Sequence, residues 1–255
     1  CIRDSVYTIW KKFSHGLGPV NGDFGKISLS LLGLNLFYKA MSSDKYILQE
    51  VVDARTEREF LDLPRKIYKG NRNWVCPLDP SIQAVFDPKK NEMFSDGEAI
   101  RWIARDKKGE VVGRIAAFYD REHAFLEEQP TGGCGFFEAI NDQELADQLF
   151  DAARMWLSSR GMEAMDAPIN FGPRDSWWGL LVSGYEFQPL YENTYNPPYY
   201  KELFENYGFQ NYFNQHTYLR RLEVGQLSDS VYERVKRLEA VSYTHLRAHE
   251  TTLHL

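Results

Sequence analysis

The sequence has few cysteines, no excess of positive charge and no long uninterrupted hydrophobic run. Its three cysteines, Cys1, Cys76 and Cys134, include no Cys-x-x-Cys pair, which argues against a disulfide framework and favours a reduced, cytoplasmic protein. The formal net charge of −6 argues against a nucleic-acid partner, because neutralising phosphates requires a basic surface. The apolar stretch Ile27–Phe37 is interrupted by Gly33 and is too short to cross a bilayer, so we expect no membrane partner.

What is present is the composition of a folded protein, with 43% hydrophobic and 15% aromatic residues. We expect residues 1–40 to be a leader outside the fold, because their glycines break any regular pattern and a strand-like run follows soon after Met41. Residues 241–255 resemble the translated adapter sequence that ends many metagenomic gene fragments, and we expect them outside the fold as well. His245 and His249 have the spacing of two ligands on one helix face, but in such a tail they predict no metal site.

Apolar periodicity and turn residues between these ends predict an α/β (α+β) domain. The clearest strands form a hairpin, in which Ala99–Arg105 and Glu110–Asp120 flank a polar turn with a late glycine. The clearest helix is Glu144–Arg160, whose apolar residues follow a 3.6-residue repeat and stop at Gly161. Further strands are expected at Tyr46–Val52, Gly135–Ile140, Ala164–Phe171 and Tyr212–Leu219, and further helices at Thr56–Tyr68, near Ser81–Phe86, at the end of the loop Gly172–Trp178 and at Pro198–Tyr207.

Short sequence signals predict one helix cap and one loop. Thr56 is expected to cap the N-terminus of the first helix, with Glu59 completing a capping box three residues later. The segment Asp120–Pro130 is polar and acidic, and we expect it to be a solvated loop between two strands.

The order of these elements, together with the run Leu-Phe-Glu-Asn-Tyr-Gly-Phe at Leu203–Phe209, is similar to the core of the GNAT-type N-acetyltransferases. The resemblance covers Tyr46–Leu222. It implies a domain over residues 41–222 with a mixed, mostly antiparallel central sheet and helices on both faces. It also implies that the parallel strands before and after the long helix splay apart and admit acetyl-CoA, which donates its acyl group to the amine of a small molecule or peptide.

A divergent bacterial group of this family can carry a second, related half. The resemblance therefore implies that residues 223–240 begin a linker or a second GNAT-like half, which would be a partner of the first in the full-length chain.

The family's phosphate-binding loop, Gln/Arg-x-x-Gly-x-Gly/Ala, is only weakly represented. When the motif is aligned with the expected helix, Asn141 stands at the Gln/Arg position and Glu144 at the position of the first glycine. Only Ala146, at the last position, matches the motif. The alternative is a capping box in which the Asn141 side chain accepts from the backbone of Glu144. Three acids, Asp142, Glu144 and Asp147, favour a helix N-terminus but repel a pyrophosphate.

The resemblance and the local chemistry together suggest catalytic residues. Glu138 lies among apolar residues of a strand on which the family often carries its base, and an apolar setting raises a carboxyl pKa; the alternative is an exposed or paired strand residue. Phe204 occupies the place of the family tyrosine that protonates the thiolate. Tyr199 and Tyr200 could replace that tyrosine, or they could be packing residues.

The remaining expectations concern the acyl-CoA. The strand Phe136–Ile140 is expected to hold the oxyanion through backbone N–H groups, as in the family, and Asn170 to face the pantetheine. Cys134 has no neighbouring histidine to activate it. The expected site is catalytic Glu138, Tyr199 and Tyr200, with Phe137, Ala139, Ile140, Asn141, Ala146, Asn170 and Phe204 on the acyl-CoA and no metal.

The sequence thus predicts an acyl-CoA-dependent N-acyltransferase. Two alternatives stay open: a GNAT-fold binding protein without catalysis, favoured by Phe204 and the altered loop, and a transferase with another acyl donor such as an aminoacyl-tRNA.

Overall fold

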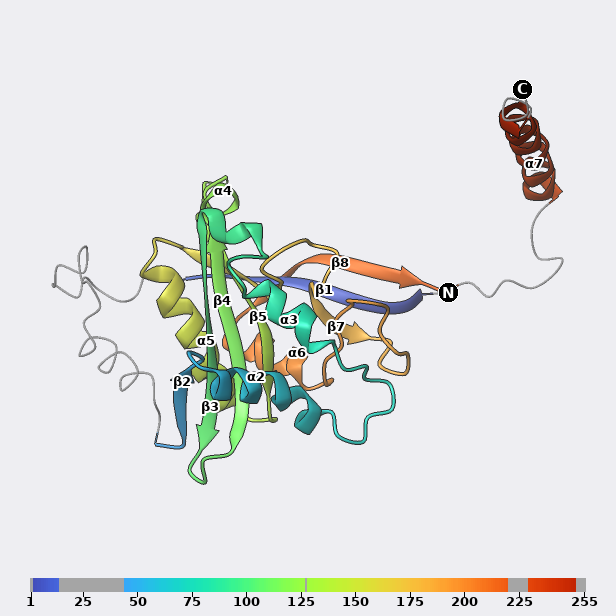
Figure 1. The fold of residues 1–255 in the computed structure, drawn as a ribbon. Coiled ribbons are helices and arrows are strands. Elements are labelled where there is room, and N and C mark those ends of the chain that lie inside the picture. The colour runs from blue at the N-terminus through green and yellow to red at the C-terminus, as the bar shows by residue number, and fades with distance from the viewer. Residues whose placement is uncertain (1, 14–43, 127, 220–228, 251–255) are drawn as a thin grey trace. The chain divides into compact units, whose positions relative to one another are not determined.

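The structure is a computed structural model that describes residues 2–13, 44–126, 128–219 and 229–250 (Figure 1). The chain divides into two units, one formed by Ile2–Thr217 and the other by Tyr218–Leu255 together with Cys1. The second unit contains α7 (Asp229–Glu250). Of the expected leader, residues 14–40 lie outside the described part, as do the side chains of His245 and His249.

Within the first unit, the described residues form one sheet of eight strands in the order β2-β3-β4-β5-β6-β1-β7, with β8 paired to β1 (Figure 1). The β5–β6 pair is parallel, and the β1–β6, β1–β7, β2–β3, β3–β4 and β4–β5 pairs are antiparallel. The strands are β1 (Ile2–Lys12), β2 (Tyr46–Glu50), β3 (Gly97–Asp106), β4 (Val111–Asp120), β5 (Thr131–Ala139), β6 (Ala164–Ala167), β7 (Leu180–Ser183) and β8 (Gln210–Tyr218).

Helices cover both faces of this sheet. The helices of the first unit are α2 (Ala54–Ile67), α3 (Asp79–Val85), a 3-10 turn η2 (Glu92–Ser95), α4 (Arg121–Ala124), α5 (Gln143–Ser158) and α6 (Tyr200–Tyr207). Successive residues of β4 point to opposite faces: Ile115 packs in the core cluster with α5 and α6, whereas Ala116 packs in a cluster near α3 and η2. The predicted GNAT-like mixed sheet, with helices on both faces, is confirmed.

The expectation that residues 1–40 lie outside the fold is wrong for Ile2–Lys12. This segment is β1, which pairs with β6 through Ile9↔Ala167 and with β7 through Tyr7↔Leu180. Its alternating polar and apolar residues gave no decisive signal, because the pairing partners lie far along the chain.

Other boundaries also differ from the expected ones. The strand after α5 ends at Ala167, because Pro168 has no N–H to continue a ladder. Gly172–Trp178 enters no helix in the described structure, and Asp120–Pro130 includes the short helix α4. The hairpin, the long helix and the helix before Tyr-Gly-Phe lie where they are predicted.

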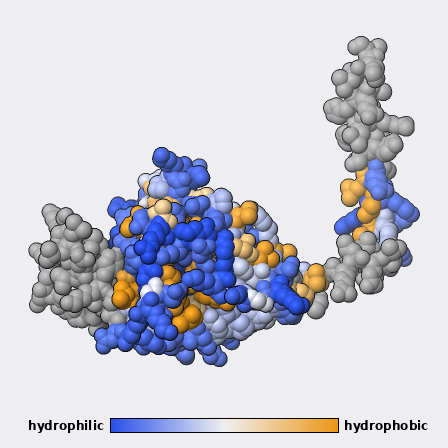
Figure 2. Space-filling model, turned by 60° about the horizontal axis from the view of Figure 1, so that its bottom comes forward, coloured by the Kyte–Doolittle hydropathy of each residue, from blue (hydrophilic) through white to orange (hydrophobic). Residues whose placement is uncertain are grey.

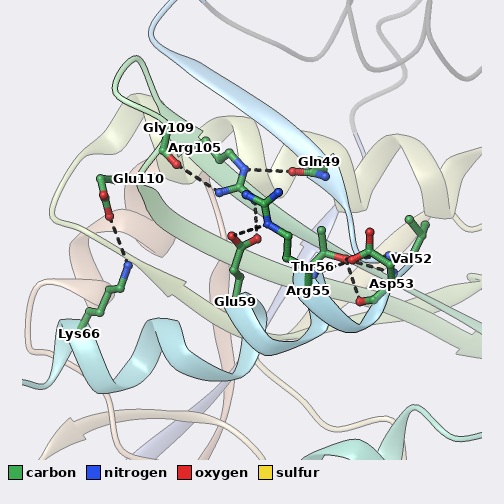
Figure 3. Close-up of polar contacts among 10 residues, drawn as sticks. All are labelled: Gln49, Val52, Asp53, Arg55, Thr56, Glu59, Lys66, Arg105, Gly109 and Glu110. Carbon is green, nitrogen blue, oxygen red and sulfur yellow. Dashed lines mark hydrogen bonds and ion pairs between the residues drawn. The ribbon is translucent and has the colours of Figure 1, made fainter.

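The cap of α2 is Asp53 rather than Thr56 (Figure 3). Asp53 Oδ1 accepts from the Thr56 backbone at 2.7 Å, and Thr56 Oγ1 accepts in return from the Asp53 backbone at 3.2 Å. Farther along the helix, Glu59 is paired with Arg105 of β3. These contacts fix α2 on the sheet and so position Tyr68, the residue that follows its last turn.

The parallel strands β5 and β6 pair only over their first residues. The register runs from Thr131↔Ala164 to Gly133↔Asp166, and a last bond joins Ile169 N to Cys134 O at 3.0 Å. β5 continues to Ala139 beyond this point, so the predicted divergence of the two strands is confirmed. At the point of divergence Phe136 has φ 52, and the β4–β5 register shifts by one residue there, as in a β-bulge.

Candidate active site

Glu138 lies on β5 just past the point where the strands part, and only 9% of it is exposed. Its Oε2 accepts a 2.7 Å hydrogen bond from the Tyr200 hydroxyl and lies 3.0 Å from the Tyr68 hydroxyl. Its Oε1 lies 3.6 Å from Nη2 of Arg114. The carboxyl group is therefore held by side chains from α6, from the end of α2 and from β4.

The β4–β5 register explains the Arg114–Glu138 pair. The two residues are directly opposite each other, so their side chains emerge on the same face. Arg114 is itself buried, donates from Nη1 to the Phe60 carbonyl at 2.6 Å and lies 4.5 Å from the centre of the Phe60 ring. The register, not sequence proximity, places a cation beside the carboxyl group.

Burial is the largest influence on the titration of this group. It raises the pKa of Glu138, and this exceeds the opposing effects of Arg114 and of the two tyrosine hydroxyls. Burial also raises the pKa values of Tyr68 and Tyr200 well above the ordinary value. A carboxyl group with a raised pKa can accept a proton from an amine near neutral pH.

The two tyrosines of the α6 N-terminus contact the free edge of β5. The Tyr200 hydroxyl accepts from the Ala139 backbone nitrogen at 2.8 Å, and the Tyr199 hydroxyl donates to the Ala139 carbonyl at 2.7 Å. Tyr200 also packs edge-on against Phe137, with ring centres 5.0 Å apart. Of the two roles considered for these tyrosines, packing is visible directly, and Tyr200 in addition contacts Glu138.

A hollow of about 110 Å³ lies beside Glu138. This is smaller than the roughly 300 Å³ at the low end of ligand pockets, so a ligand of ordinary size could enter only if the walls moved apart. Arg114 Nε and Thr194 Oγ1 are buried wall atoms without a hydrogen-bond partner in the described structure, as expected where a ligand completes a site. The apolar and aromatic residues that line this hollow include Trp74, Val75, Pro77, Ile82, Phe136, Phe137, Pro168, Trp177, Leu180, Pro189, Tyr200 and Phe204.

The other expected acyl-CoA residues are dispersed. Phe137 and Phe204 line the hollow, and Phe204 also packs in the core, 4.6 Å from Phe150 between ring centres. Ile140 is partly exposed and bonds to Val112 of β4, away from the hollow. Asn170 lines a different hollow, of about 890 Å³, near the start of β5.

At the N-terminus of α5, the cap is Asp142 and not Asn141. Asp142 Oδ1 accepts from the Leu145 backbone at 3.1 Å, and its other oxygen is paired with Lys45. Ala146 is fully buried, and its backbone nitrogen donates to the Asp142 carbonyl at 3.1 Å. The terminus is thus capped by a carboxylate, and the proposed capping box on Asn141 is not formed.

Two residues of the site, Tyr68 and Arg114, are missed by the sequence analysis. Arg114 had a usable signal, because it is the one charged residue between Val111 and Phe118 in a strand of otherwise apolar character. Tyr68 had none, since it appears as an apolar residue at the end of an amphipathic helix.

Other chemistries have little support in the described residues. Cys134 is buried, and burial raises its thiol pKa, which opposes thiolate formation. No group of three or more potential metal ligands occurs among the residues that the structure describes. In that same part of the chain, no helix combines the length and the apolar character needed to cross a membrane.

Comparison with known proteins finds relatives at low identity, and no family model matches. The chain is 28% identical over 205 residues to "Bacterial ceramide synthase" of Caulobacter vibrioides, covering 78% of this chain and 51% of that protein. It is 27% identical over 173 residues to "Protein YghO" of Escherichia coli K12, covering 66% of this chain and 43% of that protein. The chain thus spans about half the length of these curated relatives.

Two solved structures show weaker likeness. A GNAT-family acetyltransferase from Staphylococcus aureus Mu50 has a TM-score of 0.32 at 15% identity, over 46% of this chain and 69% of that one. A functionally unknown conserved protein from Staphylococcus epidermidis has a TM-score of 0.36 at 8% identity, over 83% of this chain and 59% of that one. By its element order and its splayed parallel pair, the chain has a GNAT-like fold, and its sequence is similar to those of the two curated bacterial proteins.

Proposed function

We propose that this chain carries the acyl-transfer site of an acyl-CoA-dependent N-acyltransferase. The observation that carries the proposal is the buried Glu138, held by Arg114, Tyr68 and Tyr200 at the point where β5 and β6 part. The similarity to a protein named ceramide synthase supports it, because a ceramide is the amide of a fatty acyl group and a long-chain amine. The acceptor is therefore an amine, and a long-chain amine is the first candidate.

The reaction consumes a thioester and an ammonium group. Glu138 takes one proton from the ammonium, and the neutral nitrogen attacks the thioester carbon. The C–N bond forms, the C–S bond breaks, and the thiolate leaves with the electron pair. The remaining excess proton on nitrogen passes to the thiolate or to solvent, so that the products are an amide and free CoA.

The tyrosines of α6 act as hydrogen-bond donors rather than as proton donors in this scheme. Burial raises the pKa of Tyr199 to about 12, whereas a free thiol has a pKa of about 8.5. Proton transfer from such a hydroxyl to the thiolate is unfavourable, and a thiolate is a good leaving group without it. For the Ala139 N–H to hold the oxyanion, the Tyr200 hydroxyl has to leave it first.

The test is the release of free CoA from acetyl-CoA and from hexadecanoyl-CoA in the presence of a soluble primary amine. Glu138→Gln keeps the shape and removes the base, so turnover should fall by about 100-fold or more with little change in acyl-CoA affinity. Glu110→Gln is the control, because Glu110 is exposed and its carboxylate pairs with Lys66 at the surface. Full turnover in Glu138→Gln would refute the base assignment.

A second candidate is a GNAT-fold protein that binds a ligand other than an acyl-CoA and catalyses no transfer. The carboxylate cap at the start of α5, with Asp142 on the Leu145 backbone, supports it, because a pyrophosphate would meet negative charge there. Thermal shifts with acyl-CoA separate the two candidates. A shift together with CoA release in the presence of an amine supports the transferase, whereas no shift with any acyl-CoA supports the binding protein.

A further inference from the structure

Two loops are fixed side by side at the hollow next to Glu138. Asn73 Nδ2 of the loop after α2 donates to the Tyr185 carbonyl of the loop after β7 at 3.0 Å. Asn71 Nδ2 lies 3.2 Å from the Tyr195 hydroxyl of the same second loop. Residues of both loops line the hollow, so the two loops together form its mouth.

These loops carry large apolar side chains that face solvent. The exposed fractions are 51% for Val75 and 66% for Leu78 on the first loop, and 50% for Leu190 and 81% for Tyr191 on the second. We call these four residues the apolar rim. Single exposed hydrophobic residues are common, but four of them on two loops that are bonded to each other suggest an interaction surface. Figure 2 shows how hydrophobic areas interrupt an otherwise largely hydrophilic face of the protein.

The apolar character continues from the rim into the hollow. Val75 belongs to both, and the neighbouring rim residues follow Pro77 and Pro189, which line the hollow. The charged residues of the lining are Arg114 and Glu138, which are paired with each other. An alkyl chain can therefore extend from the surface towards Glu138 along apolar walls.

Contrary to the expectation of no membrane partner, we propose that the apolar rim docks on the surface of a lipid bilayer, from which the long-chain amine enters the hollow. This inference rests on the proposed acyl transfer. A bilayer fits better than a protein partner, because a protein covering the mouth would close the route to Glu138, whereas a bilayer supplies molecules to it. The first of the two loops also carries the exposed basic residues Lys69 and Arg72, and basic residues together with aromatic and aliphatic ones are typical of contacts with anionic membranes.

The experiment is flotation of the chain with vesicles made of equal parts phosphatidylethanolamine and phosphatidylglycerol. The rim variant is Leu78→Ser/Leu190→Ser/Tyr191→Ser, which spares the lining of the hollow. The matched control replaces three other exposed hydrophobic residues, Ile47, Phe125 and Leu126, with serine. Thermal melting of both variants verifies that they are folded.

We expect the parent and the control to float with the vesicles and the rim variant to lose about 10-fold or more of its bound fraction. Acyl transfer to a soluble short amine should be unchanged in the rim variant, while transfer to a long-chain amine carried in vesicles should fall. If that transfer is equal in parent and rim variant, the amine does not enter from the bilayer. If the long-chain amine is accepted as well from dispersed solution as from vesicles, the rim recognises the alkyl chain of the amine and not the bilayer.

Three results would overturn the docking. They are a parent that does not float, a control that loses binding as much as the rim variant, and a dimer of the parent in light scattering that the rim variant lacks. Each leaves the chemistry intact if CoA is still released with the soluble amine. Conversely, flotation that depends on the rim, without any release of CoA, would support docking on the bilayer and refute acyl transfer.

Discussion

The hydroxyl of Tyr200 donates a 2.7 Å hydrogen bond to Oε2 of Glu138. The same hydroxyl oxygen accepts from the backbone of Ala139 at 2.8 Å, so one side chain of α6 contacts both the proposed base and the free edge of β5. If a thioester displaces the Tyr200 hydroxyl from the Ala139 N–H, the hydrogen bond that positions Glu138 changes as well.

Replacing this phenol should affect stability and not only activity. Tyr200→Phe leaves the Ala139 N–H without its acceptor and removes a donor from Glu138, and buried groups left in this way cost about 1 to 3 kcal/mol. Tyr199→Phe removes the donor to the Ala139 carbonyl but leaves the contacts of Glu138 and of the Ala139 N–H in place, and it should cost less. Urea unfolding of the two variants measures the difference. Equal losses would show that the contacts of Tyr200 do not order the site.

Arg114→Met should shift the pH dependence of acyl transfer. Arg114 lowers the pKa of Glu138 against the larger effect of burial, so its removal raises that pKa further. Glu138 then becomes ionised only at higher pH, and the acid limb of kcat/KM moves upwards. Arg105→Met is the control, because Arg105 pairs with Glu59 and not with Glu138 (Figure 3). An unchanged acid limb in Arg114→Met would mean that another group is titrating.

The same variant carries a prediction for stability. A carboxyl group whose pKa is raised on folding binds more protons in the folded state than in the unfolded one, so stability falls as pH rises from the unfolded pKa through the folded pKa. Arg114→Met enlarges this shift, and its loss of stability relative to the parent should therefore be greater at high pH than at low pH. Denaturant unfolding at several pH values tests the sign.

Gly135→Ala should disrupt the point where the strands part. A Cβ at this position would lie 1.7 Å from the carbonyl oxygen of Ile169, which is backbone and cannot move away cheaply. We expect a loss of about 3 kcal/mol or more. Gly161→Ala meets no atom within 4 Å and has only an unfavourable φ of 87°, so about 1 to 2 kcal/mol is expected there. Similar melting temperatures for the two variants would contradict the close approach of β5 and Ile169.

Deleting residues 1–13 should destabilise the first unit, because β1 pairs with both β6 and β7. Deleting residues 241–255 removes part of the second unit and should leave the main melting transition in place. Calorimetry of the two truncated chains makes the comparison. An unchanged transition after the first deletion would show that the sheet does not need β1.

The fold was predictable where the signals are local. The Asp106–Gly109 turn specifies the β3–β4 hairpin, and the apolar repeat of α5 is complete within one segment. Glu138 was likewise recognisable as a polar residue in an apolar strand. The cap of α2 was misplaced by three residues because Asp53 and Thr56 are both capping residues and each serves the other.

The rest depends on contacts distant in sequence. Tyr68 reaches Glu138 only after α2 has docked on the sheet, and Arg114 reaches it only through the strand register. Asn170 was assigned to the site because it was expected within the strand Ala164–Phe171, but this strand ends at Ala167 and Asn170 lines another hollow. These positions depend on how the sheet is assembled, so they cannot be predicted from the hydrophobic periodicity within one segment.

The position of β1 also determines the order in which the sheet can be completed during synthesis. β1 precedes the other described strands of the sheet, but Ile9 pairs with Ala167, about 160 residues later. At about 5 to 20 residues per second, this strand waits on the order of ten seconds without a partner, exposing edge groups that can pair with other chains. The hairpin and α5 can form during that interval. The pairings of β1 with β6, β7 and β8 close the longest loops among the described strands, so we expect them to form last.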